Sequence, residues 1–81
     1  MTRIPRDVSA KDLVKALASY GYAPVRQAGS HIRLTTLEPS KHHVTVPNHK
    51  ALRLGTLASI VDDVAQHHGL TRDQVIAKLF R

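Results

Sequence analysis

The first regular pattern of hydrophobic residues along the chain is that of an amphipathic helix. Ser9 stands before it as an N-cap residue with Asp12 three positions later, and Gly21 follows it as a helix stop. Between these signals, apolar side chains recur with the i, i+3, i+4, i+7 spacing that places them on one helix face. This apolar stripe consists of Leu13, Ala16, Leu17 and Tyr20. The pattern predicts a helix over residues 10–20.

Three short segments in which apolar and polar residues alternate come next, and they indicate strands. The segments are 22–27, 31–36 and 42–46. Pro24 confines the first segment to a sheet edge or to the start of a strand, because proline has no backbone N–H to donate. Short loops separate the segments, so we expect an antiparallel meander with one apolar and one polar face. The polar face is expected to carry His31, Arg33, His43 and Thr45.

Helical patterning returns in the last third of the chain. An apolar stripe predicts a second helix from about residue 55 to residue 68. Thr71 and Gln74 then form a capping box for a short additional helix over about residues 72–80. The order is α-β-β-β-α(-α), which is an α+β fold. Helices on one side would cover the apolar face of a three-stranded antiparallel sheet.

Length and charge narrow the range of functions. We expect the 81 residues to form one domain, with residues 1–8 as an N-terminal arm and with function on a surface or in a shallow cleft. Twelve Lys and Arg residues oppose six acidic residues, and the resulting net charge of +6 favours a polyanionic partner. The chain has no cysteine and no long apolar run. We therefore expect a cytoplasmic protein without disulfides and without a membrane span.

The sequence lacks the common nucleotide-binding and hydrolytic motifs. It contains no Walker loop, GxGxxG, HExxH or GxSxG. Asp62 and Asp63 are neighbours that diverge by about 100° on a helix, which makes them a poor metal clamp. The histidine pairs at 42–43 and 67–68 diverge on a strand and on a helix, respectively. We therefore expect neither a metal nor a cofactor.

His31 is the candidate for acid–base chemistry. It follows Gly29 and Ser30 at the start of a strand, on the polar face, and an imidazole exchanges a proton near neutral pH. Basic residues in or beside the sheet would bind a phosphate, whereas the scarcity of aromatic residues argues against recognition of bases by stacking. The expected RNA or phosphate contacts are Arg26, Ser30, Arg33, Lys41, Lys50 and Arg53. The alternatives are an exposed histidine without a role and basic residues that only solubilise the protein.

Four short segments occur in an informative order and spacing. They are LASYGY at 17–22, VRQAGSH at 25–31, VTVP at 44–47 and LGTL at 54–57, the last followed by Ile60. In this arrangement the chain resembles the HicA toxin family, the YcfA-like mRNA interferases. The resemblance implies a fold like that of a double-stranded RNA-binding domain. It also implies a ribosome-independent endoribonuclease, the toxin of a type II toxin–antitoxin system, whose one essential histidine falls on His31.

The resemblance further implies partners, and the chemistry of RNA together with these residues suggests a mechanism. The partners are mRNA and a HicB-type antitoxin that covers His31, and oligomers form only through that antitoxin. Cleavage would proceed by attack of a 2′-OH on the adjacent phosphate, which needs no metal. His31 would be the general base or the general acid, and His43 is the candidate partner in proton transfer if the strand register allows it. A non-catalytic RNA-binding module and a module that binds an acidic protein remain as alternatives.

Overall fold

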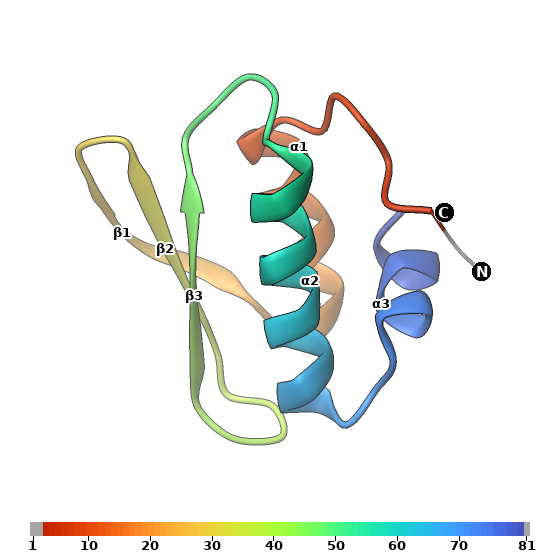
Figure 1. Cartoon of the computed structure of the whole chain (residues 1–81). Helices are drawn as coiled ribbons and strands as arrows, with labels where there is room; N and C mark the ends of the chain where they lie inside the picture. The colour runs from red at the N-terminus through yellow and green to blue at the C-terminus, as the bar shows by residue number, and fades with distance from the viewer. Residues whose placement is uncertain (1–2, 81) are drawn as a thin grey trace.

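The elements found in the structure follow the predicted order. A computed structural model describes residues 3–80 and contains a three-stranded sheet and three α-helices (Figure 1). Their bounds are α1 Ala10–Leu17, β1 Ala23–Ala28, β2 His31–Thr36, β3 His42–Pro47, α2 Leu54–His68 and α3 Arg72–Leu79. A 3₁₀ turn, Ala18–Tyr20, continues α1, so the first helix has the predicted extent with a tighter final turn. The α+β class predicted from the hydrophobic pattern is confirmed.

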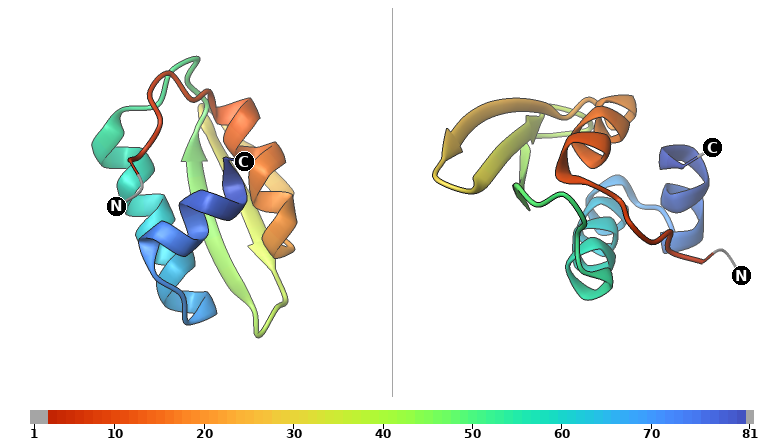
Figure 2. Two further views of the ribbon diagram at one scale, coloured as in Figure 1. Left: turned by 90° about the vertical axis from the view of Figure 1, so that its right-hand side faces the viewer. Right: turned by 90° about the horizontal axis from the view of Figure 1, so that it is seen from above.

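All three helices lie on one side of the sheet. Figure 2 shows α1 and α2 side by side next to the sheet, with α3 across them on the side away from it. Both α1 and α2 contact β3, whereas α3 packs on α1 and α2. Within residues 3–80, no helix is long and apolar enough to cross a membrane. The other side of the sheet has no helix over it in the described part of the chain, and we call it the open face.

The core consists of the apolar stripes of the helices packed on alternate residues of β2 and β3. Leu13, Leu57 and Val61 from the helices are completely buried, as are Leu34 and Val46 from the strands. Complete burial of such a side chain contributes about 1.5–3 kcal/mol relative to its exposure. Because apolar residues alternate with polar ones along β2 and β3, the same alternation leaves the polar residues on the open face.

The first strand begins one residue later than the pattern predicts. Tyr22 is only 2% exposed and belongs to the core, whereas every residue of β1 is exposed. β2 is the central strand and β1 is an edge strand, so Pro24 stands where a missing N–H is tolerated. Figures 1 and 2 show the hairpin of β1 and β2 projecting beyond the helices.

A left-handed glycine makes the turn between α1 and β1. Gly21 has φ 82°, a conformation that L-residues rarely adopt. A Cβ atom at this position would lie 2.8 Å from Oγ1 of Thr36, which is 1% exposed. That hydroxyl donates a hydrogen bond of 2.9 Å to the carbonyl oxygen of Tyr20. Both the backbone conformation and the available space at this turn therefore require glycine.

Candidate functional site

The strand register arranges the open face in three rows that cross the sheet. Directly paired residues of an antiparallel sheet present their side chains to the same face, and successive rows lie about 7 Å apart along the strands. The His31 row is Ala28, His31 and Pro47; the arginine row is Arg26, Arg33 and Thr45; and the His43 row is Ala23, Thr35 and His43. The polar face predicted from the sequence is therefore present, and β1 contributes to it.

A β-bulge brings a second arginine onto this face. The pairing of β1 with β2 skips one residue between Pro24 and Arg26, so that Val25 is left unpaired. Without the bulge, alternation from Ala23 would direct Arg26 to the other side of the sheet. With it, Arg26 stands directly opposite Arg33.

The arginine pair has no acidic partner on the sheet. Like charges directly opposite each other on neighbouring strands are destabilising unless an anion lies between them. The ion pairs among the described residues use the carboxylates of Asp62 and Asp63, both on α2, so neither Arg26 nor Arg33 is neutralised. The two guanidinium groups can therefore bind an anion such as a phosphate.

His31 lies one row away from the arginine pair, next to the turn of the β1–β2 hairpin. Its side chain is exposed and its backbone neighbour across the sheet is Pro47. The backbone N–H of Asn48 donates a hydrogen bond of 2.6 Å to the carbonyl oxygen of Ser30. This bond joins the hairpin turn to the segment after β3, so Ser30, His31 and Asn48 lie at one end of the open face.

The remaining basic candidates separate into two groups. The segment after β3 is tied to α1 by a hydrogen bond from the N–H of Ala10 to the carbonyl of His49. This bond places Lys50 at the same end of the molecule as His31, in a hollow that also contains Lys11, a residue that the sequence analysis missed. Of the other two candidates, Lys41 precedes β3 at the opposite end of the sheet, and Arg53 is the N-cap residue of α2.

His43 shares the open face with His31 but does not lie beside it. It is paired with Thr35, four residues along β2 from His31, which corresponds to about 13 Å. Its Nδ1 atom lies 2.6 Å from Oγ1 of Thr35. Partial burial, followed by the charges of Arg33, Lys41 and His42, lowers the pKa of His43. Direct proton transfer between His31 and His43 is therefore excluded by the register at this separation.

A second group of histidines lies on the covered side, where the sequence analysis expected divergent pairs. Oη of Tyr22 lies 2.8 Å from Nδ1 of His42 and 3.2 Å from Nε2 of His68. Nε2 of His42 lies 3.2 Å from a carboxylate oxygen of Asp63. His67 stacks on His42 with ring centroids 4.2 Å apart. These contacts link β3 to the end of α2, and we call the five residues the tyrosine–histidine cluster.

One assignment of donors and acceptors accounts for the hydrogen bonds of this cluster. If Nε2–H of His42 donates to Asp63, its Nδ1 accepts from the hydroxyl of Tyr22, which in turn accepts from Nε2–H of His68. Each of these three hydrogen bonds then has one donor and one acceptor. Among residues 3–80, no group of three or more His, Cys, Asp or Glu side chains is placed to hold a metal ion. The cluster therefore has a structural explanation, as a connection between the sheet and α2.

Stability is expected to fall in acid because of this cluster. Burial, with the charges of His67, His42 and Lys78, lowers the pKa of His68 below 6.5, and Glu38 opposes this shift. The unfolded chain then binds a proton that the folded chain resists, so the free energy of unfolding decreases as the pH falls through 6.5. Urea denaturation across this range should show the decrease. The decrease in the free energy of unfolding should be smaller in His68→Gln than in the wild type, and it should be unchanged in His31→Ala. If the free energy of unfolding varied equally with pH in all three proteins, His68 would not be the cause.

A loss of stability at alkaline pH is expected from the same cluster. Burial, and then the charge of Asp63, raises the pKa of Tyr22 to about 12 from 10.0. A raised pKa means that the folded state retains a proton that the unfolded chain loses. The contribution of Tyr22 to the free energy of unfolding is therefore fully present below pH 10 and is lost as the pH rises towards about 12.

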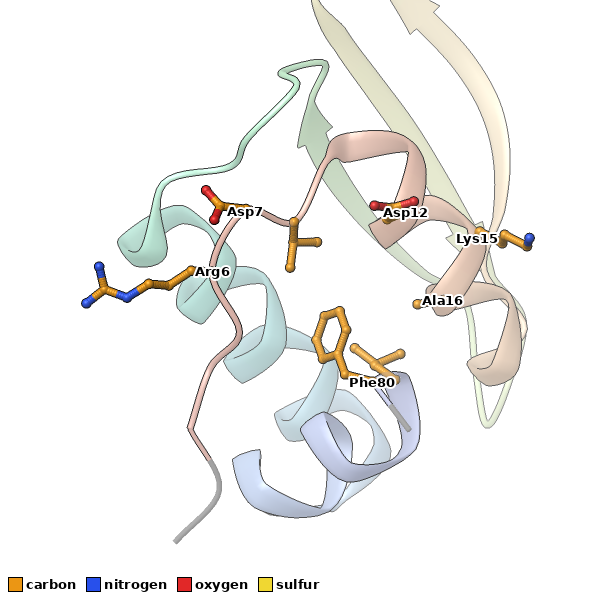
Figure 3. A pocket seen from close by; sticks show the side chains of 8 residues that line it. Arg6, Asp7, Asp12, Lys15, Ala16 and Phe80 are labelled. Carbon is orange, nitrogen blue, oxygen red and sulfur yellow. The ribbon is translucent and has the colours of Figure 1, made fainter.

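Another hollow lies among the helices, away from the open face. It has a volume of about 540 Å³ and lies between the N-terminal segment, α1 and α3 (Figure 3). Its lining mixes Asp7 and Asp12 with Arg6 and Lys15, and the ring of Phe80 borders it. Its lining includes none of the residues that the sequence leads us to expect at an RNA site.

Comparison with known proteins agrees with this arrangement. Residues 10–70 match the family described as "HicA toxin of bacterial toxin-antitoxin". Searches among curated proteins and among solved structures find no match. The matched region covers most of the chain, from the start of α1 through the open face to the end of α2, and α3 lies beyond it. The chain therefore belongs to the HicA toxin family, the toxins of bacterial toxin–antitoxin pairs.

Proposed function

We propose that this toxin is a metal-independent endoribonuclease that uses His31 to cleave mRNA without the ribosome. The observation that carries the proposal is the position of His31 one row from Arg26 and Arg33 on an uncovered face. A proton-transfer group and an unneutralised pair of guanidinium groups are the components that phosphodiester cleavage needs. The net charge of +6 supports a polyanionic substrate.

In the proposed reaction the RNA provides its own nucleophile. The 2′-oxygen attacks the adjacent phosphorus, the bond from phosphorus to the 5′-oxygen breaks, and the products are a 2′,3′-cyclic phosphate and a 5′-OH. His31 either takes the proton from the 2′-OH or gives one to the departing 5′-oxygen. Arg26 and Arg33 stabilise the charge that develops on the phosphate oxygens. Ser30 and Lys50 are further candidate contacts to the phosphates on either side.

The antitoxin of the pair has a simple way to inhibit such an enzyme. His31 and the arginine row lie on the open face and their side chains are exposed. A HicB-type partner that covers this face would exclude RNA from both. We propose inhibition by covering of the site.

Product analysis tests the reaction directly. The purified toxin is incubated with a mixed-sequence RNA in EDTA without ribosomes, and the ends of the products are mapped. We expect cyclic phosphate and 5′-OH ends. An RNA of the same sequence with a single 2′-deoxy nucleotide at a mapped site should resist cleavage there. Cleavage at that nucleotide, or a requirement for metal, would contradict the mechanism.

A non-catalytic RNA-binding module has the same fold and charge, and the same assay separates it from the nuclease. Such a module would bind the RNA and leave it intact in every condition. Tight, salt-dependent binding without any cleavage by the wild-type protein would replace the proposed function with this alternative.

The salt dependence of RNA binding is expected to show whether the arginine pair contacts phosphate. Each phosphate neutralised by a protein cation releases counterions, so the affinity for RNA falls linearly with salt on logarithmic axes. Arg33→Gln should lower this slope by about 1 and weaken binding to all sequences alike. The matched control is Lys15→Gln on α1, which removes one charge from the helical side and should leave the slope unchanged. Equal slopes in wild type and Arg33→Gln would show that Arg33 does not contact phosphate.

A further inference from the structure

An apolar hollow occupies the end of the open face farthest from His31. It has a volume of about 490 Å³. Its lining residues are Gly21, Ala23, Val25, Thr35, Leu37 and Glu38. Val25 is 60% exposed and Leu37 is 72% exposed, and these are two of the three large exposed hydrophobic side chains among residues 3–80. Single exposed apolar residues are ordinary, but a pair that lines one hollow beside a charged row indicates a contact surface.

The β-bulge contributes one wall of this hollow. Val25 is the unpaired residue of the bulge, and it lines the hollow with Ala23 and Thr35, which are on the open face. Bulges on edge strands commonly redirect a side chain. Here the same irregularity exposes an apolar side chain and directs the next residue, Arg26, towards Arg33. The hollow and the arginine row are thus adjacent parts of one surface.

His43 is the cross-strand partner of Thr35, which lines the hollow. The hydrogen bond of 2.6 Å between Nδ1 of His43 and Oγ1 of Thr35 holds the ring in one orientation. Partial burial, followed by the charges of Arg33, Lys41 and His42, lowers the pKa of His43 and so favours the neutral imidazole. A neutral, oriented ring of this kind is suited to stacking on a nucleobase.

We propose that the hollow and His43 form a binding subsite for one nucleobase of the RNA. This inference rests on the proposed function in that it takes RNA to be the polyanion. The charges select this occupant: Arg26 and Arg33 lie on one side of the hollow for phosphate, and Lys41 precedes His43 on the other. A base would contact the apolar walls of Val25 and Leu37 and stack on the His43 ring. The scarcity of aromatic residues in the sequence applies to Phe, Tyr and Trp, and a histidine ring can also stack on a base.

The subsite would read a base next to the cleavage site. The His43 row lies about 13 Å from the His31 row, with the arginine row between them. A nucleotide seated in the hollow would therefore adjoin the phosphate that is cleaved, which lies near the arginine pair and one row from His31. The subsite would select the position of cleavage, and His31 would perform it.

Glu38 gives the subsite a preference. It is the one acidic residue among those that line the hollow. A carboxylate accepts hydrogen bonds from the exocyclic amino group of cytosine, whereas uracil presents a carbonyl oxygen at that position. We expect cytosine to be favoured over uracil.

The test measures binding separately from cleavage. Short RNAs with every 2′-hydroxyl methylated resist the proposed reaction, and they are prepared as oligocytidine, oligouridine and an abasic strand of equal length. Wild-type toxin should bind oligocytidine roughly tenfold more tightly than the abasic strand. Leu37→Ser and His43→Ser should bind all three strands alike, and Glu38→Gln should equalise cytosine and uracil. Leu54→Ser changes the third exposed apolar residue, at the start of α2, and should behave as wild type.

The outcomes separate this inference from the proposed function. Equal binding of base-bearing and abasic strands by wild type, or unchanged preferences in the Leu37→Ser and His43→Ser variants, would overturn the subsite. If the toxin still cleaved unmodified RNA, the proposed nuclease function would stand although the subsite had failed. Base-dependent binding that is lost in the two variants, without any cleavage, would support the subsite and overturn the nuclease. Loss of antitoxin binding alone in Leu37→Ser would assign the hollow to a protein contact and overturn the subsite as well.

Discussion

A His31→Ala variant is expected to cleave RNA about 10²–10⁴-fold more slowly than the wild-type toxin, because one positioned proton-transfer group contributes a factor of that size. Its fold should not change, since the His31 side chain is exposed at the end of β2. Exposed substitutions of this kind alter stability by about 0.5 kcal/mol or less. RNA affinity should also remain close to the wild-type value, because Arg26 and Arg33 stay in place. Single-turnover cleavage rates and binding isotherms measured on the same preparation check both statements.

The matched control is a histidine from the covered side of the sheet. His67→Gln removes an imidazole from the last turn of α2, where His67 stacks on His42, and it should cleave at the wild-type rate. A comparable loss in both variants would indicate damage to the fold. Undiminished cleavage by His31→Ala would show that another group, or a contaminating nuclease, performs the reaction.

Gly21→Ala is expected to lower the free energy of unfolding by about 2–5 kcal/mol. A left-handed conformation costs an L-residue about 1–2 kcal/mol. The new Cβ would also lie 2.8 Å from Oγ1 of Thr36 and would displace that hydroxyl. Losing the buried bond from Thr36 to the carbonyl of Tyr20 costs a further 1–3 kcal/mol or so. For a chain of this length, with roughly 4–12 kcal/mol of total stability, the change is large. Urea denaturation measures it.

Gly69→Ala separates the two contributions. Gly69 has φ 67° at the end of α2, and nothing lies within 4 Å of a Cβ atom added there. This variant should lose only the conformational part, about 1–2 kcal/mol. If the two alanine variants were equally stable, the contact with Thr36 would carry no energy and the steric explanation for Gly21 would fail.

The helices and the faces of the strands could be predicted because their signals are local. The apolar stripe ending at Tyr20 and the capping box at Thr71 appear in the structure where the pattern put them, and Thr71 and Gln74 do form both reciprocal hydrogen bonds. The alternation in β2 correctly placed His31 and Arg33 opposite the core. Each of these predictions depends on residues at most a few positions apart, whose side-chain directions follow from helix or strand geometry alone.

Proximity between strands could not be predicted in the same way. His43 was correctly assigned to the face of His31, yet the pairing places it opposite Thr35, because register depends on how two strands slide past each other. The bulge at Val25 has no signal in the alternation of β1, and it alone decides that Arg26 faces Arg33. The meeting of Tyr22 with His68 joins residues 46 positions apart. The repeat of apolar and polar residues along the chain does not indicate contacts between residues so far apart in sequence.

By itself, the sequence determined the order of elements, the side of each that is apolar, and the motifs that show membership of the HicA toxin family. It also supplied His31 as the candidate for chemistry. The tertiary structure decided which of the candidates share a site. In the tertiary structure, Arg26 and Arg33 lie in one row and His43 lies at the end of the open face away from His31. Tyr22 links β3 to α2. The physical reason is that side-chain direction is set by local backbone geometry, whereas the distance between side chains is set by strand register and packing.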